Sequence, residues 1–312
     1  GPFQNLGAQV IKQAAKQTVE TAGDGTTTST VLARAILTEG QRYLTSGVSP
    51  VELQRGINKA VEAIVERLDD LSRPIETVED IKHIATISAN NDKTIGTLIS
   101  TAVDKAGKDG SVLVEEARSM KTTLDLIEGF RFDSGYLSGQ FINNERTGTV
   151  EYDNPIILIT DEKIEHVEQI MPTLTIAARD SRPLLIVAPD VEGQALAALI
   201  ANSVRGTMKV AAVRAPKYGE ERRNVMKDLA ASVGAVLVSR EAGLSLKEVK
   251  LNDFGQAKSV SITKGWTTIV GGKGDWEDVD TRIAAIKNEI QQTENLKECE
   301  RLQERITRLA SG

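Results

Sequence analysis

The chain has 312 residues, and its 38 lysines and arginines against 44 aspartates and glutamates give a net charge of −6 at pH 7. This mild acidity argues against a nucleic-acid-binding protein, because neutralising phosphates requires clustered cations. The longest apolar run, residues 183–189, is far shorter than the roughly 20 residues of a membrane span. We therefore expect a soluble protein of two or three domains, with neither nucleic acid nor membrane as a partner.

Cysteine and aromatic content set two further expectations. Cys299 is the only cysteine, so an internal disulfide is excluded and a reducing compartment is expected: the cytoplasm, or an organelle matrix or stroma. Aromatic residues make up 4% of the chain, so its cores must be built from Ala, Val, Ile and Leu. Because the chain starts at Gly1-Pro2 without a methionine, we expect a segment of a longer protein.

Residues 1–73 predict three helices. Apolar residues recur at helical spacing from Leu6 onward until glycines interrupt the pattern at 23–25. A second helix is predicted over 27–44. Ser49 is placed to cap a third helix that has Pro50 at its first position.

Residues 75–128 predict shorter elements, consistent with a small α+β domain joined through Pro74 and Gly129. Helices are expected over 78–87 and 93–106, and strands over 110–114 and 124–127.

The remainder predicts a parallel sheet covered by helices, because four apolar runs alternate with helical segments. These runs are residues 155–160, 183–188, 209–215 and 235–239. Two further runs, 260–264 and 267–270, flank Gly265 and predict a hairpin. Residues 276–309 predict one long charged helix that packs through a single apolar stripe.

A run of small and hydroxyl residues, Gly-Asp-Gly followed by five Thr or Ser, lies at 23–30 between two predicted helices. Glycines let backbone N–H groups curl round an anion, a helix N-terminus favours negative charge, and a nearby aspartate can bind Mg²⁺. The run therefore suggests a triphosphate site without the lysine of a P-loop. Turn and N-cap roles for Asp24 and the threonines are the alternative, and both interpretations stay open.

Other polar residues offer weaker signals. The run 86–92 is most simply an N-cap for the helix that follows, with a ligand contact as the alternative. His83 and His166 have no Cys or His neighbour at ligand spacing, so no zinc-type site is supported. No serine elbow or dinucleotide glycine motif follows the predicted strands.

Two helical segments, 164–178 and 191–204, are apolar almost all round. A helix on one sheet face needs only a stripe of apolar residues. Either both sides of these helices are covered, which the pattern alone favours, or one side forms an exposed apolar groove for binding.

Taken together, these stretches closely resemble the group I chaperonins, the GroEL and mitochondrial or plastid chaperonin-sixty family. The resemblance extends over essentially the whole chain in unbroken order. Its matching strings are AGDGTTT at 22–28, TISAN at 86–90, EGFRFDSGY at 128–136, DVEGQALA at 190–197, VAAVRAPKYGE at 210–220 and residues 297–309.

The resemblance implies a multidomain protein of α/β and α+β class, of which this chain is an internal fragment. Residues 1–73 would be part of an all-helical equatorial domain, 74–128 part of an α+β intermediate domain, and 129–312 a complete α/β apical domain. Pro74, Gly129 and Gly312 match hinge positions. The intact protein would form two stacked homo-oligomeric rings of seven subunits.

The resemblance also implies the sites. It makes the exposed groove the better interpretation of the two apolar helices, and it assigns ATP and Mg²⁺ as cofactors, with Asp24 as the metal ligand. The nucleotide-binding residues would be Gly23, Asp24, Gly25, Thr26, Thr27, Thr28, Ile87, Ser88 and Asn90. The surface for non-native polypeptides and a co-chaperonin lid would comprise Tyr136, Phe141, Met171, Leu174, Leu196 and Ile200.

The implied function is ATP-dependent protein folding inside a ring-shaped cage. The family's catalytic aspartate and further phosphate loops lie outside this chain, so it holds no catalytic residue and we expect no ATP turnover by the chain alone. An ATP-independent holdase that only binds non-native polypeptides is the alternative. Gln140 and Ala201 depart from the larger apolar residues usual at these positions, and Ser134 replaces a customary arginine.

Overall fold

The computed structural model describes residues 1–107, 112, 114, 120–124 and 129–311. The chain divides into two compact units. The first comprises Gly1–Gly107 with Thr293–Glu300, and the second comprises Lys108–Gln292 with Arg301–Gly312.

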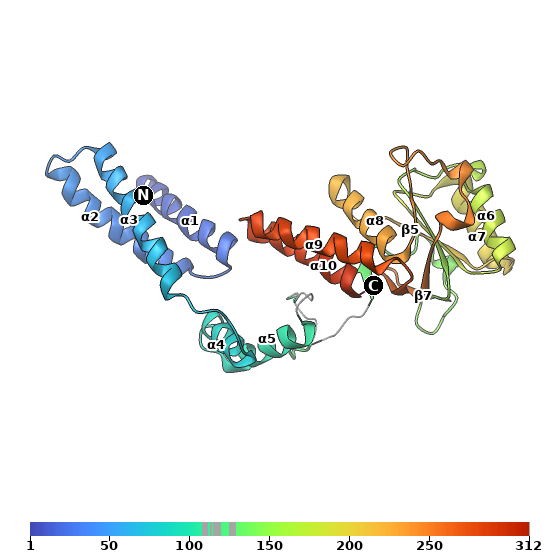
Figure 1. Ribbon diagram of the computed structural model, residues 1–312, viewed down its shortest axis with the longest axis horizontal. Coiled ribbons are helices and arrows are strands. Elements are labelled where there is room, and N and C mark those ends of the chain that lie inside the picture. Colours follow the sequence, from blue (N-terminus) through green and yellow to red (C-terminus); the bar gives the residue numbers. More distant parts are fainter. Residues whose placement is uncertain (108–111, 113, 115–119, 125–128, 312) are drawn as a thin grey trace. The chain divides into compact units, whose positions relative to one another are not determined.

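The first unit is helical, as the sequence predicts (Figure 1). Helix α1 packs against α2, and α4 packs against α5. Ser49 caps α3 as expected, because its side chain accepts a hydrogen bond from the backbone N–H of Glu52. The helices are α1 (Pro2–Ala22), α2 (Thr26–Thr45), α3 (Pro50–Leu71), α4 (Val78–Ser88) and α5 (Lys93–Ala106).

Helices α1–α4, all of them described, contain no buried residue. Apolar side chains on α2 illustrate this: Val31 is 61% exposed and Leu32 is 55% exposed. Amphipathic helices gain most of their stability by packing an apolar face against a partner. The apolar faces of these four helices are therefore free to pack against further protein.

The two strands predicted in the α+β segment, 110–114 and 124–127, lie on residues that the structure mostly leaves undescribed.

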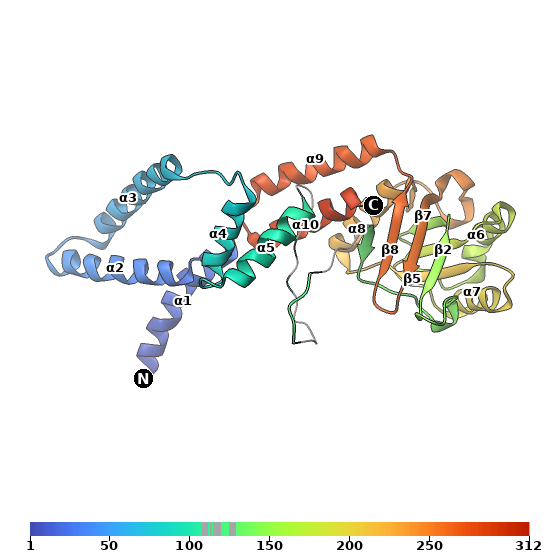
Figure 2. The same cartoon turned by 90° about the horizontal axis from the view of Figure 1, so that it is seen from below.

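The second unit is built on a mixed sheet whose order is β1-β8-β7-β3-β4-β5, with β2 paired to β7 and β6 paired to β3 (Figure 2). The predicted parallel strands are confirmed, since β4 and β6 flank β3 and β5 follows β4, all in parallel. The predicted hairpin is β7–β8. The strands are β1 (Phe130–Phe132), β2 (Val150–Asp153), β3 (Ile156–Thr160), β4 (Leu184–Ala188), β5 (Val210–Arg214), β6 (Leu237–Val238), β7 (Gly255–Ile262) and β8 (Thr267–Gly272).

Every residue of β3 and β4 is buried, which is the pattern of strands covered on both faces. The core is mainly aliphatic, as the low aromatic content predicts. The remaining elements are α6 (Val167–Asp180), α7 (Gly193–Arg205), α8 (Gly219–Val233), α9 (Trp276–Gln292), α10 (Leu296–Ser311) and three 3₁₀ turns, η1 (Gly139–Phe141), η2 (Leu246–Glu248) and η3 (Leu251–Asp253).

The prediction of one long helix over 276–309 is wrong, because the segment forms two helices, α9 and α10. Asn295 caps α10, its side-chain oxygen accepting a hydrogen bond from the Glu298 N–H at 3.1 Å. An asparagine that bonds the backbone in this way favours a helix start over a helix interior. The apolar stripe is continuous in sequence and so did not reveal the break.

A buried carboxylate ties three helices of the second unit together. Asp228 on α8 is fully buried and accepts hydrogen bonds from Arg282 on α9 at 3.0 and 2.7 Å. It also accepts hydrogen bonds from Arg305 on α10 at 2.8 and 3.0 Å. Burial lowers the pKa of Arg305, but the hydrogen bond to Asp228 and the negative charges of Asp228 and Glu289 together outweigh burial, and the pKa is raised. Breaking one partner of such a group leaves a buried charge without compensation.

We therefore predict that Asp228→Ala lowers the free energy of unfolding of the second unit by about 3–5 kcal/mol. The measurement is urea denaturation of the full chain followed by circular dichroism. Glu241→Ala is the matched control, because Glu241 forms an exposed ion pair with Lys227 at 3.9 Å and its loss should cost at most about 1 kcal/mol. Equal small losses in both variants would contradict the structural role of Asp228.

Candidate functional site

The junction between α1 and α2 depends on two glycines in the left-handed region. Gly23 (φ +76°) ends α1, and its N–H donates to the Val19 carbonyl at 2.9 Å. Gly25 (φ +91°) is the residue that precedes the first turn of α2. Only glycine adopts such φ values without strain, so the sequence GDG is what permits this tight junction.

The N-terminus of α2 has no side-chain cap. Asp24 acts within the turn, accepting a hydrogen bond from the Gly25 N–H at 2.7 Å. The hydroxyls of Ser29 and Thr30 donate to the Thr26 carbonyl and so are directed away from the helix end. The first N–H groups of α2 therefore remain available to an anion, and the residues around them are exposed. Within the interpretation as turn and N-cap residues, the turn role of Asp24 is confirmed and side-chain capping of α2 is wrong, while the triphosphate interpretation stays a prediction.

The second predicted nucleotide-binding stretch lies at the junction of α4 and α5. Ile87 and Ser88 are exposed in the last turn of α4, and Asn90 follows with a left-handed φ of 58°. The N-cap interpretation of this run is confirmed by Asp92, which accepts hydrogen bonds from the N–H groups of Thr94 and Ile95 at 3.0 and 3.2 Å. The predicted nucleotide residues thus occupy two different helix junctions.

Metal-binding groups are sparse. The described residues include no cluster of three or more His, Cys, Asp or Glu side chains that could hold a metal ion. His83 lies beside Glu79, with Nε2 at 3.3 Å from the carboxylate, and His166 lies at the start of α6. Asp24 could supply one carboxylate ligand to a metal ion that is also coordinated by bound phosphate groups.

Helices α6 and α7 each bury one stripe and leave other apolar side chains at the surface. The buried positions on α6 include Ile170 and Ala177, and on α7 they are Ala195 and Leu199. Met171 on α6 is 49% exposed. In this chain the alternative of coverage on both sides is wrong, and an apolar surface remains on these two helices.

The six residues predicted to form that surface differ in burial. Met171 is exposed, and Leu196 and Ile200 are partly buried against the core. Tyr136 is also partly buried, with its hydroxyl donating to the Gly148 carbonyl at 3.3 Å. Phe141 and Leu174, 1% and 8% exposed, belong to the core. The structure brings the group together, since α7 contacts both α6 and η1.

A lysine joins the N-terminal ends of α6 and α7. Lys163 Nζ lies 3.0 Å from Glu165, just before α6, and 2.9 Å from Glu192, just before α7. The hydrogen bonds that Lys163 donates to Glu192 and to Glu165 raise the pKa of Lys163, and accepting the hydrogen bond from Lys163 lowers the pKa of Glu165. Sequence reasoning missed this cluster because charged residues before helices are common on solvated surfaces.

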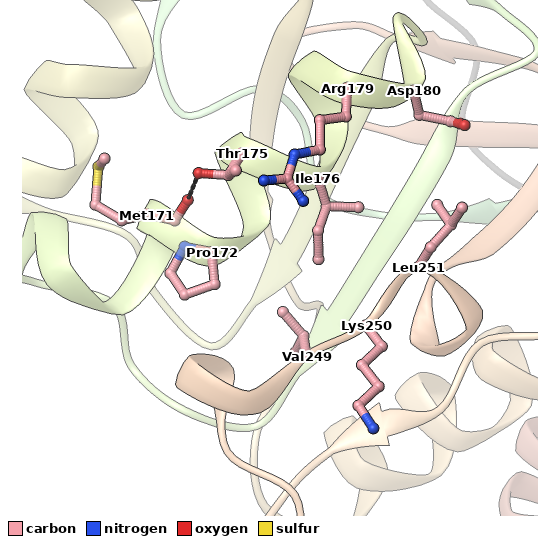
Figure 3. Close-up of a pocket in the computed structure, with 9 residues that line it drawn as sticks. All are labelled: Met171, Pro172, Thr175, Ile176, Arg179, Asp180, Val249, Lys250 and Leu251. Atoms are coloured by element: carbon pink, nitrogen blue, oxygen red, sulfur yellow. Dashed lines mark hydrogen bonds between the residues drawn. The ribbon is translucent and has the colours of Figure 1, made fainter.

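Sequence reasoning also missed a groove between α6 and the η2–η3 segment (Figure 3). Its residues on α6 include Met171 and Ile176, and its opposite side includes Val249 and Leu251. The periodicity of α6 marks Ile176 as apolar, but the loop residues follow no periodic pattern, so no sequence signal joins the two sides.

The predicted hinge residues are placed as follows. Pro74 lies between α3 and α4, and Gly129 precedes β1 with a φ of +105°. A Cβ on Gly129 would lie 3.0 Å from the Ile269 carbonyl oxygen, so this position requires glycine. Gly312 lies outside the described residues.

These observations together define a class. An α/β unit that exposes apolar helices, carried on the same chain as a helical unit, is the arrangement of a chaperonin subunit. The family model described as the TCP-1/cpn60 chaperonin family matches residues 2–301, and the chain belongs to that family. Membership supports a chaperonin-type role in protein folding. Over the described residues, no helix combines the length and apolarity needed to cross a membrane.

The burial differences give a direct test of which predicted residues are structural. We expect Phe141→Ala to cost about 3–5 kcal/mol of unfolding free energy, since it empties a core position. Met171→Ala should cost about 0.5 kcal/mol or less, because this side chain is half exposed. Denaturant titration of the full chain measures both. An unchanged stability for Phe141→Ala would place this ring at the surface.

Proposed function

We propose that the chain is the polypeptide-binding part, with an incomplete nucleotide-binding part, of a group I chaperonin whose intact form folds proteins with ATP. The observation that carries the proposal is the set of exposed or partly exposed apolar side chains on α6 and α7, above a rigid buried sheet. Exposed apolar patches on soluble domains mark interaction surfaces. In the intact protein the partners would be non-native polypeptides and a co-chaperonin lid, within seven-membered rings.

The chemistry of this surface suits clients without a common sequence. Apolar area attracts apolar segments without directional requirements, and unfolded chains expose such segments. Met171 adds a flexible, polarisable side chain that adapts to different partners. Release would follow when the domain carrying α6 and α7 rotates in response to nucleotide and lid, which is a rigid-body transition.

The α1–α2 junction fits part of a nucleotide site. The uncapped end of α2 would accept phosphate oxygens on its N–H groups, with the hydroxyls of Thr26, Thr27 and Thr28 as further donors. Asp24 would hold Mg²⁺ through a carboxylate oxygen. ATP, when bound, supplies the free energy that drives the conformational cycle. Ile87, Ser88 and Asn90 would add contacts from the α4–α5 junction.

The domain assignment is part of the same proposal. Helices α1–α3 would be one portion of an equatorial domain, and their exposed apolar faces would pack against other portions of it. Residues 74–128 would belong to an intermediate domain, with Pro74, Gly129 and Gly312 as hinges. The proposed compartment is the cytoplasm, or an organelle matrix or stroma.

A passive holdase is the second candidate, favoured by one observation. The residues that would bind nucleotide are confined to two helix junctions, and the described part of the chain has no metal cluster. A chain of this kind would bind clients without a nucleotide cycle.

Client binding is tested by suppression of aggregation of a chemically unfolded protein, monitored by light scattering. We predict that Met171→Ser and Leu196→Ser each weaken binding about fivefold, because each removes roughly 1 kcal/mol of apolar contact. Trp276→Ser is the matched control, since Trp276 is a 71% exposed apolar residue at the start of α9. Equal weakening by the control would show that exposed apolar area anywhere suffices and would contradict a site on α6 and α7.

Nucleotide dependence is tested on the same chain. We predict that the chain releases phosphate from ATP only at the background rate, and that Mg²⁺-ATP binding, measured calorimetrically, is weakened at least about tenfold by Asp24→Asn, which removes the proposed metal ligand. Asp69→Asn, at an exposed position on α3, is the control. Turnover well above background would refute the first expectation, and equal affinities in all three proteins would refute the assignment of Asp24.

A further inference from the structure

The groove between α6 and the η2–η3 segment shares Met171 with the α6–α7 surface, but no residue of α7 lines it, and its other side comes from residues 249–251. Its volume is about 770 Å³, within the range of pockets that bind specific ligands. It is lined by Met171, Pro172, Thr175, Ile176, Arg179, Asp180, Val249, Lys250 and Leu251.

The floor of the groove is apolar. Figure 3 shows Val249 directed toward α6, with Pro172 and Ile176 across the groove from it. Val249 is buried and Ile176 is partly buried, whereas Met171 and Leu251 are 49% and 46% exposed. A side chain entering here would therefore bury apolar area on both sides of the groove.

The rim carries positive charge that has no partner. Arg179 and Lys250 are exposed, and within the described part of the chain neither forms an ion pair. Asp180, the one acidic lining residue, already pairs with Arg182 at 3.4 Å. Figure 3 shows the two cations on opposite sides of the groove, with the Lys250 amine directed away from α6, so an incoming carboxylate would pair with one of them.

The remaining polar group is already satisfied. The Thr175 hydroxyl donates to the Met171 carbonyl at 2.9 Å, which the dashed line in Figure 3 marks. Recognition of a polar partner in this groove therefore depends on Arg179 and Lys250. A cationic rim round an apolar floor complements a segment with apolar and acidic side chains and repels a basic one.

We propose that this groove is a second docking site, one that binds a peptide segment combining an apolar side chain with a nearby carboxylate. The apolar side chain of the segment would lie on the floor between α6 and Val249, and its carboxylate would pair with Arg179 or with Lys250. The site goes beyond the proposed function, since it selects by charge whereas the α6–α7 surface selects by apolar area alone.

Fluorescence anisotropy with three labelled ten-residue peptides tests the proposal on the full chain. The peptides share two leucines and differ in carrying two aspartates, two lysines or two serines. We expect the aspartate peptide to bind about tenfold more tightly than the lysine peptide. Arg179→Glu and Lys250→Glu should each weaken it about fivefold, because an attractive contact becomes repulsive. Higher ionic strength should weaken it too, since these charges are exposed.

Lys264→Glu, which changes an exposed cation in the β7–β8 turn, is the matched control and should leave affinity unchanged. Leu196→Ser on α7 should keep the preference for the aspartate peptide over the lysine peptide, because the proposed client surface does not select by charge, so this result separates the groove from that surface. A benzophenone in place of one leucine of the peptide should crosslink to the η2–η3 segment.

Four outcomes would overturn the proposal. The first is equal affinity for the three peptides. The second is a crosslink confined to α7. The third is concentration-dependent self-association of the chain, lost in Lys250→Glu, which would assign the groove to a second copy. Tighter binding of decanoate than of the aspartate peptide would likewise assign it to a small apolar acid.

Discussion

One-sided burial of α6 and α7 is the constraint on which the rest of the structure depends. Strands β3 and β4 consist mainly of buried Ile, Leu and Val. Each helix can therefore be anchored to the core through a single stripe of buried residues. The apolar side chains beyond that stripe are only partly buried, like Leu196 and Ile200, or exposed, like Met171. Aromatic residues make up only 4% of the chain and Phe141 lies in the core, so aliphatic and methionine side chains would supply most of the contacts in the proposed polypeptide binding.

The two units differ in how far they bury their apolar side chains. The second unit encloses a continuous core and even buries a carboxylate, Asp228, between two arginines. Helices α1–α4 of the first unit contain no buried residue, although their sequences are amphipathic. The proposed binding surface therefore lies on the unit that encloses the buried core. A response to nucleotide would require the helical unit to pack against further protein.

Local rules made most elements predictable from the sequence. Ser49, the glycines at 23 and 25, and the four apolar runs each have a local physical consequence, and each is found in the structure. The helix break at Asn295 was not predicted, because the apolar stripe continues past this position and a single polar capping residue is a weaker sequence signal than that stripe. Burial of Phe141, the Lys163 cluster and the groove on α6 depend on contacts between segments far apart in sequence, which periodicity does not encode.

Helices α6 and α7 form the proposed surface for binding non-native polypeptides, and methyl NMR tests this proposal most directly. Methyl groups of the full chain would be recorded with and without a permanently unfolded client. We predict that the resonances of Met171 and Ile200 shift or broaden, while those of Ile186, fully buried in β4, do not. Unchanged Met171 and Ile200 signals, with changes confined to the exposed apolar residues of α1–α3, would contradict the account.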